Sequence, residues 1–188
     1  MTLSFYTIGH STRSTAEFVD LLGASQIALV VDVRHIPRSR TNPQFNREIL
    51  PEELGRFQIG YVHLAALGGL RSKPRGIEMS PNVFWKNSSF RNYADYALTD
   101  EFQKGLTDLR ELGHKQRTAV MCAEAVWWRC HRRIITDYLI SAGETVFHIL
   151  GSDRVDRALL TPGAVRQANG TVVYPVPIGP ASDPPAGS

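Results

Sequence analysis

The amino-acid sequence predicts an α/β domain, with a mainly parallel β-sheet and helices on both faces in a single three-layer arrangement. Short runs rich in β-branched residues alternate with helical stretches along the chain, which is typical of parallel sheets. The run IALVVDV (27–33) is almost continuously apolar, as expected of a strand that is buried on both faces. The length of 188 residues, of which 43% are hydrophobic, suits one core and one domain.

Local patterns predict each element in turn. The segment LSFYTIG (3–9) is rich in aromatic and β-branched residues and predicts the first strand. Ser14 and Glu17 then form a capping box, and the apolar residues that follow share one face of a helix. The alternation continues with strand 27–33, helix 47–57, strand 59–64, helix 99–112, strand 117–123, helix 126–141 and strand 145–150.

Two regions depart from this alternation. Residues 65–92 are rich in Gly, Pro, Ser and Asn, and we expect a long loop there that its interleaved aromatic side chains keep ordered. Residues 161–188 form a C-terminal extension to the domain of residues 1–160. The Pro/Gly/Ser-rich end of this extension, 175–188, predicts a flexible tail.

The charge of the chain permits an anionic partner without requiring one. The formal net charge is +3 and the pI is near 9.0. Between residues 34 and 91 the sequence has ten Lys or Arg residues against four acidic residues, so the excess lies largely in expected loops. These loops include Arg40 and Arg71, which we expect to bind the negative charge of a ligand.

The N-terminus and the cysteines predict a cytoplasmic protein with free thiols. The N-terminus has no secretory pattern, and no apolar run approaches the ~20 residues of a membrane helix. Cys122 and Cys130 are eight positions apart with only His131 beside them, which is not a zinc-type spacing. No metal ligand is therefore predicted, although the fold could still assemble a metal site from distant residues, and the cofactor stays open.

The ends of the predicted strands indicate where a ligand binds. In open parallel sheets, ligands occupy the crevice beyond the carboxyl ends of the strands. His10 follows the first strand, Asp32 and Arg34 end the second, and Cys122 and Glu124 end the fourth. We therefore expect His10, Arg34 and Glu124 to line one cleft. Asp32 and Arg34 could also form a purely structural ion pair.

Cys122 is the candidate nucleophile. A thiol between a buried strand and the start of a helix lies in a field that lowers a cysteine pKa. The alternative is a cysteine that packs as a small hydrophobic residue. Glu124 could serve as a general base or as a partner for arginines. His10 or His131 could move protons, unless His131 is a packed core histidine.

Arginines that follow the cysteine could hold an anion. Arg129, Arg132 and Arg133 have the i, i+3, i+4 spacing of one stripe near the start of the expected helix 126–141. Cations there oppose the helix dipole, so a phosphate or carboxylate ligand could compensate them. The alternative is a solvated surface that Glu124 and Asp137 neutralise. The neighbouring tryptophans are expected mainly in the core.

Several longer motifs carry a resemblance to known families. The segment VDVRHIPRSRTNPQFN resembles the Asp-Val-Arg strand of rhodanese-like domains, but the stretch from Cys122 to Arg129 is one residue longer than their loop and has no glycine. The motifs TIGHSTRSTAEFVDLL, VVDVRHIPRSRTNPQFN, GYVHLAALGGLR, SFRNYADYALTDEFQKGL and VMCAEAVWWRCHRRIITDYLISAGETVFHI resemble domain of unknown function 488. This resemblance implies a small intracellular α/β protein and no particular substrate.

Two functions remain open from the sequence. The first is an enzyme that acts on an anionic, phosphate-bearing or nucleotide-like molecule, with the cation-bearing loops as its binding site and Cys122, Glu124, His131 and His10 as catalytic residues. The second is a non-catalytic nucleic-acid-binding module that uses the basic loops with Trp85 or another exposed aromatic residue. A closed pocket around Cys122 favours the enzyme, and an open basic face favours the module.

Overall fold

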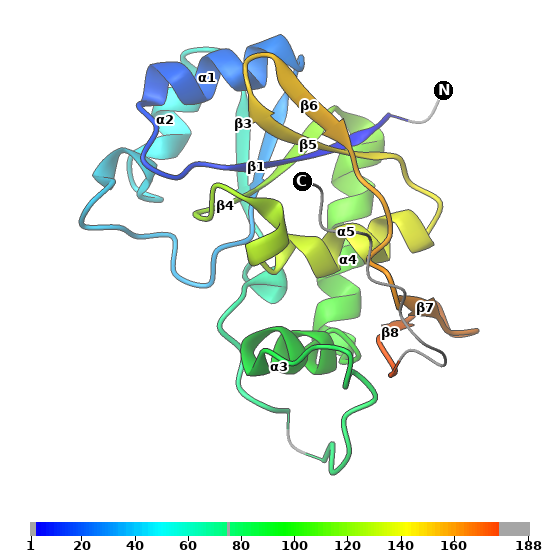
Figure 1. The fold of residues 1–188 in the computed structure, drawn as a ribbon. Helices are drawn as coiled ribbons and strands as arrows, with labels where there is room; N and C mark the ends of the chain where they lie inside the picture. Colours follow the sequence, from blue (N-terminus) through cyan, green and yellow to red (C-terminus); the bar gives the residue numbers. More distant parts are fainter. Residues whose placement is uncertain (1–2, 75, 177–188) are drawn as a thin grey trace, which may run out of the picture.

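The computed structural model describes residues 3–74 and 76–176. A six-stranded sheet with the order β3-β2-β4-β1-β5-β6 forms its centre (Figure 1). The first five strands are parallel and β6 is antiparallel to β5, so the expected α/β class with a mainly parallel sheet is confirmed. The strands are β1 (Phe5–Gly9), β2 (Leu29–Asp32), β3 (Gly60–His63), β4 (Thr118–Cys122), β5 (Val146–Gly151) and β6 (Arg154–Arg157).

Helices cover both faces of the sheet. The helices are α1 (Thr15–Ala24), α2 (Leu50–Gly55), α3 (Ser88–Tyr96), α4 (Asp100–Lys115) and α5 (Arg132–Ser141), with short 3-10 turns η1 (Pro43–Phe45), η2 (Ala65–Leu67) and η3 (Trp127–Arg129). Side chains of α1 and α2 pack with Val30 and Met121 in one apolar cluster. Side chains of α3, α4 and α5 pack with Val31 and Val120 in the other. Alternation along each strand divides the core into these two clusters.

Two helices differ clearly from the expected elements. The expected helix 126–141 begins only at Arg132, after the separate turn η3, because Cys130 has an extended backbone conformation (φ −123°, ψ 148°) that ends the turn. The expected loop 65–92 ends in helix α3, whose first turn Asn87 caps with its side-chain oxygen. Runs of Asn and Ser obscured this helix, although the same residues are favoured at helix starts.

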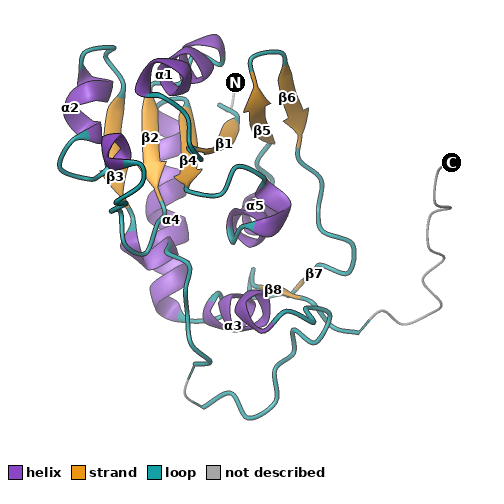
Figure 2. Cartoon of the chain, turned by 60° about the vertical axis from the view of Figure 1, so that its left-hand side comes forward, coloured by secondary structure: helices purple, strands orange, loops and turns teal. Residues whose placement is uncertain are grey.

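Aromatic side chains order the segment before α3. Trp85 is buried, stacks on Phe90 at a ring-centroid distance of 4.9 Å, and meets Tyr174 edge-on. Tyr174 follows the small hairpin of β7 (Val165–Arg166) and β8 (Val172–Val173). This hairpin and α3 therefore lie together at one end of the molecule (Figure 2). The last residues of the expected flexible tail, 177–188, lie outside the described residues.

The described helices do not include a membrane-spanning one. None of them combines the length and the apolar character that crossing a bilayer requires.

Gly9 permits a close approach between two strand ends. A β-carbon at Gly9 would overlap the carbonyl oxygen of Glu124 and would also lie 2.9 Å from Ala125 Cα. Replacing Gly9 with Ala should therefore push the loop after β4 outward and lower the free energy of unfolding by about 2–3 kcal/mol. Chemical denaturation checks this value. Replacing Gly23 with Ala is the control, because its added β-carbon meets no atom within 4 Å. An equal stability of both variants would contradict the prediction.

Candidate functional site

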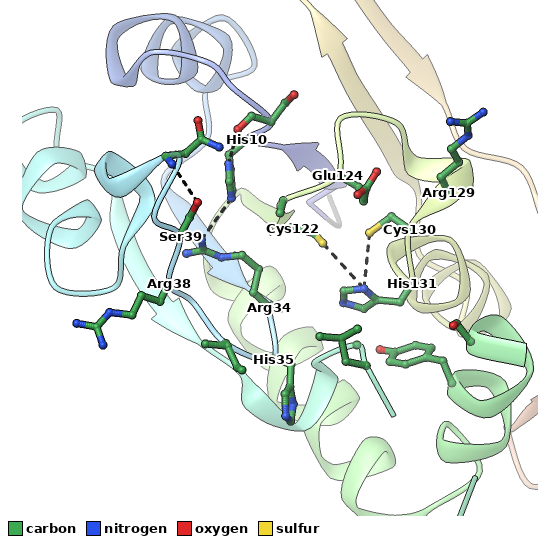
Figure 3. A pocket seen from close by; sticks show the side chains of 18 of the residues that line it. His10, Arg34, His35, Arg38, Ser39, Cys122, Glu124, Arg129, Cys130 and His131 are labelled. Atoms are coloured by element: carbon green, nitrogen blue, oxygen red, sulfur yellow. Dashed lines mark hydrogen bonds between the residues drawn. The ribbon is translucent and has the colours of Figure 1, made fainter. Parts of the chain in front are cut away.

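A cavity of about 580 Å³ lies beyond the carboxyl ends of β1, β2 and β4 (Figure 3). Its position agrees with the rule for open parallel sheets. His10, Arg34 and Glu124 all line it, as their places after three different strands predicted. The other residues of its wall include His35, Ile36, Arg38, Ser39, Asn42, Gly69, Leu70, Phe90, Tyr93, Cys122, Arg129, Cys130 and His131.

Arg34 is fixed by a buried ion pair at the end of β2. The Asp32 side chain is fully buried and accepts hydrogen bonds from Arg34 Nε (2.9 Å) and Arg34 Nη2 (2.6 Å). Tyr61 donates to the same carboxylate at 2.6 Å, and Arg34 Nη2 also donates to the carbonyl of Phe45 at 2.6 Å. Asp32 therefore lies behind the cavity wall, where it holds the cation that lines the cavity.

His10 is neutral and held on both ring nitrogens. Its Nδ1 donates to the carbonyl of Ser11 (2.9 Å), and its Nε2 faces Arg34 Nη1 at 3.3 Å, where it can only accept. The ring also stacks on Phe45 at a centroid distance of 4.2 Å. Burial, with a further effect of the Arg34 charge, lowers the pKa of His10 to about 4. At neutral pH His10 is therefore a neutral imidazole with its single proton on Nδ1, and its Nε2 contacts Arg34.

Cys122, Cys130 and His131 form a compact cluster at the floor of the cavity. The Nδ1 atom of His131 lies 3.9 Å from Cys122 Sγ and 3.6 Å from Cys130 Sγ (Figure 3). The other nitrogen of the ring, Nε2, donates to the carbonyl of Val33 at 2.9 Å. The neutral tautomer with this donor has its lone pair on Nδ1, which faces both sulfurs.

The contacts that favour a thiolate prevail at Cys130 and are outweighed at Cys122. Arg132 donates from Nε (3.3 Å) and from its backbone N–H (3.5 Å) to Cys130 Sγ, which lies at the start of α5. Burial opposes ionisation of Cys130, but the hydrogen bond from Cys122 and the Arg132 charge outweigh it and hold the pKa of Cys130 well below its usual value. The same hydrogen bond, together with burial, raises the pKa of Cys122.

This result corrects the expectation that the Cys122 pKa is lowered. The reason is that the helix begins ten residues beyond Cys122, at Arg132, so its N-terminus acts on Cys130. Cys130 was not among the predicted catalytic residues. Its position two residues before the first helical residue and beside Arg132 is the sequence signal that could have identified it.

The structure also separates the predicted arginine stripe. Arg129 belongs to η3 and lines the cavity. Arg132 is 1% exposed and its Nη2 donates to the carbonyl of Glu124, so it acts within the protein. Arg133 points to Thr161 Oγ1 (2.9 Å) and lies over the Trp85 ring. The expected common stripe is therefore wrong, because the chain changes direction at Cys130.

Two other predicted arginines lie outside the cavity wall. Arg71 donates to the carbonyls of Gly68 (2.9 Å) and Ala65 (2.7 Å) and covers the Tyr96 ring at 3.9 Å, so it supports the chain after β3. Arg40 is exposed and does not line the cavity. Arg38, two residues earlier, does line it. Sequence alone could not choose between neighbouring arginines in one loop.

Comparison with known proteins gives one result. A family model described as "Domain of unknown function DUF488" matches residues 14–139, which is more than half of the chain and includes most of the cavity wall. No curated protein and no solved structure matches the chain.

Proposed function

The chain belongs to the DUF488 family, and we propose that it is an enzyme acting on an anionic small molecule that carries a phosphate or resembles a nucleotide. The observation that carries this proposal is that one cavity joins a fixed buried cation, Arg34, to the Cys122, Cys130 and His131 cluster. Fixed cations bind an anionic group at low entropic cost, and a thiolate beside an imidazole can supply reactive chemistry.

The size and composition of the cavity suit a small ligand. A volume of about 580 Å³ falls within the roughly 300–1,000 Å³ of ordinary ligand pockets. Phe90 and Tyr93 contribute aromatic rings, and Leu70 and Ile36 contribute apolar side chains to the wall. This mixture can hold a planar or apolar part of a ligand next to its charged group.

The cavity wall favours negative charge. Arg34, Arg38 and Arg129 line it, whereas Glu124 is the one carboxylate among its lining residues. Arg34 is buried and fixed, while Arg38 and Arg129 are exposed near the opening. The exposed pair can adjust to a ligand that Arg34 already orients. Glu124 carries no side-chain hydrogen bond among those described and is the candidate general base.

The burial of Trp85 favours a small molecule over nucleic acid as the ligand. Trp85 is only 6% exposed and packs inside an aromatic cluster, so its ring face is not available to a base. Among the described tryptophans, Trp128 is the most accessible, at 43% exposed. One accessible tryptophan ring offers little surface for the stacking of nucleic-acid bases.

Replacing both Arg38 and Arg129 with Ala should weaken the binding of AMP or ribose 5-phosphate more than tenfold, because each arginine contributes a charge-assisted contact of about 1.5–3 kcal/mol. Isothermal titration measures this change. Arg40→Ala combined with Arg47→Ala is the matched control, because it also removes two exposed positive charges but from positions outside the cavity. Equal weakening by the control would mean general electrostatic attraction and would contradict the site.

A second measurement tests the enzymatic part of the proposal. A ligand that binds in this way is incubated with wild-type protein and with Cys130→Ser, and product is followed by phosphorus NMR. Turnover by the wild type and its loss in the variant support the enzyme. Binding without turnover would leave a binding module. Tight binding of a single-stranded oligonucleotide in place of the small phosphates would favour the nucleic-acid function.

A further inference from the structure

We infer that Cys122, Cys130 and His131 form a binding site for one thiophilic divalent metal ion of the zinc class, with one coordination position open to the cavity. The three side chains each offer one ligand atom, and these atoms lie within 4.8 Å of one another. Two sulfurs and one imidazole nitrogen prefer Zn²⁺ to Mg²⁺ or Ca²⁺.

The distances between the ligand atoms suit a tetrahedral ion. With Zn–S near ~2.3 Å and Zn–N near ~2.0–2.1 Å, a tetrahedral site separates sulfur from nitrogen by about 3.5 Å. The Nδ1 atom of His131 lies 3.6 Å from Cys130 Sγ and 3.9 Å from Cys122 Sγ. One ion placed between the three atoms would need only small movements of the side chains.

The ligand atoms are already oriented by their surroundings. The His131 ring donates its Nε2–H to the Val33 carbonyl, the contact that commonly fixes a metal-bound histidine and leaves Nδ1 for the ion. The two N–H groups of Arg132 that point at Cys130 Sγ suit a thiolate, which is the form that binds a metal. The cluster therefore has the outer contacts of a metal site in addition to its three ligands.

Gly69 leaves room for the metal-facing nitrogen. A β-carbon at Gly69 would lie 2.8 Å from His131 Nδ1, closer than ordinary packing allows. The ring could not turn away easily, because the Val33 carbonyl holds one side and Tyr93 packs edge-on at 5.0 Å. A glycine at this position keeps a free volume next to the atom that would bind the ion.

The open position faces the ligand cavity. Both cysteines and His131 line the cavity, and among the described residues no fourth His, Cys, Asp or Glu joins the cluster. Three protein ligands with one open position are the arrangement of catalytic zinc sites, whereas structural zinc sites use four. A water molecule or an oxygen of a bound anion can complete the coordination. This inference does not depend on the identity of the anionic ligand.

Metal-free protein should bind one equivalent of Zn²⁺ and should gain thermal stability from it. One equivalent of Co²⁺ should give the near-ultraviolet charge-transfer absorption of cobalt–thiolate bonds. The variants Cys122→Ser, Cys130→Ser and His131→Asn should each weaken Zn²⁺ binding roughly a hundredfold or more, measured by competition with a chromophoric chelator. Mg²⁺ should produce none of these effects. No anion is added, so the result is independent of the phosphate-binding test.

Two further variants keep the result interpretable. His35→Asn removes another imidazole from the cavity wall and should leave Zn²⁺ affinity unchanged. Gly69→Ala retains all three ligands, so it still tests the site if a cysteine variant fails to fold, and it should weaken Zn²⁺ binding about tenfold or more by displacing His131. Wild-type protein that does not bind Zn²⁺, or cysteine variants that bind it unchanged, would overturn the inference. A disulfide between Cys122 and Cys130 in freshly isolated protein would also overturn it.

Discussion

Replacing Asp32 with Asn is expected to lower the free energy of unfolding by about 3–5 kcal/mol, because it leaves Arg34 as a buried charge without a counter-ion. The Asp32 side chain is completely buried and Arg34 is only 6% exposed, so water cannot replace the lost carboxylate. The hydrogen bond from Tyr61 to Asp32 also loses its charge. Urea denaturation at neutral pH measures the change.

Glu52→Gln is the matched control for this substitution. Glu52 of α2 accepts from Arg56, the residue after the helix, at 2.9 Å in an exposed pair four residues apart, and such pairs contribute about 0.3–0.5 kcal/mol. Replacing Asp32 with Leu and Arg34 with Met together should restore much of the stability that Asp32→Asn loses, because it removes both buried charges. If the proposed function is right, this double variant should still fail to bind the small phosphates. A loss below about 1 kcal/mol for Asp32→Asn would contradict the prediction.

Acid should destabilise the protein through two buried histidines. Burial, with a further effect of the Arg132 charge, lowers the pKa of His148 to about 4, and His10 has a similarly low pKa. Above pH 6.5 both residues are neutral in the folded and unfolded chains. As the pH is lowered from 6.5 to 4, these histidines take up protons in the unfolded chain but not in the folded protein. The free energy of unfolding therefore decreases by up to about 3 kcal/mol for each histidine.

His148→Phe isolates one of these contributions. The imidazole of His148 stacks on Trp127 at 4.4 Å, a contact that a phenyl ring can keep. The replacement removes the hydrogen bond between His148 Nδ1 and Thr7 Oγ1 (2.7 Å), which lowers stability at every pH and leaves the pH-dependent part to be compared. The loss of unfolding free energy between pH 7 and 4 should then be smaller by about 3 kcal/mol. The same dependence of unfolding free energy on pH in wild type and His148→Phe would contradict the prediction.

The position of the site could be predicted from sequence because strand ends are strong signals. The alternation of apolar runs placed β1, β2 and β4, and in a parallel sheet the residues after these strands must meet at one edge. His10, Arg34 and Glu124 therefore share a cavity although they lie far apart along the chain. This argument needs only the order of elements and their approximate ends.

The individual roles could not be predicted, because they depend on where one helix begins. The helix α5 begins at Arg132 and not at residue 126, so the field of its N-terminus favours a thiolate at Cys130 and not at Cys122. The same change directs the Arg132 side chain toward Cys130. Helix boundaries are the least certain part of any sequence pattern. The contact between Cys122 and His131 also depends on tertiary packing that neither residue's neighbours indicate.

Residues at the end of β2 hold the polar groups of the cavity in fixed positions, whereas other residues of the cavity wall are free to change in sequence. Asp32 holds the Arg34 guanidinium, and the carbonyl of the residue between them, Val33, anchors His131. Both anchors lie within one short stretch of backbone at the end of β2, so the cation and the imidazole are held from the same segment. Ile36 and Leu70 also line the cavity, but their apolar side chains are exposed. Substitutions there can therefore redirect ligand preference during evolution while the reactive centre keeps its geometry.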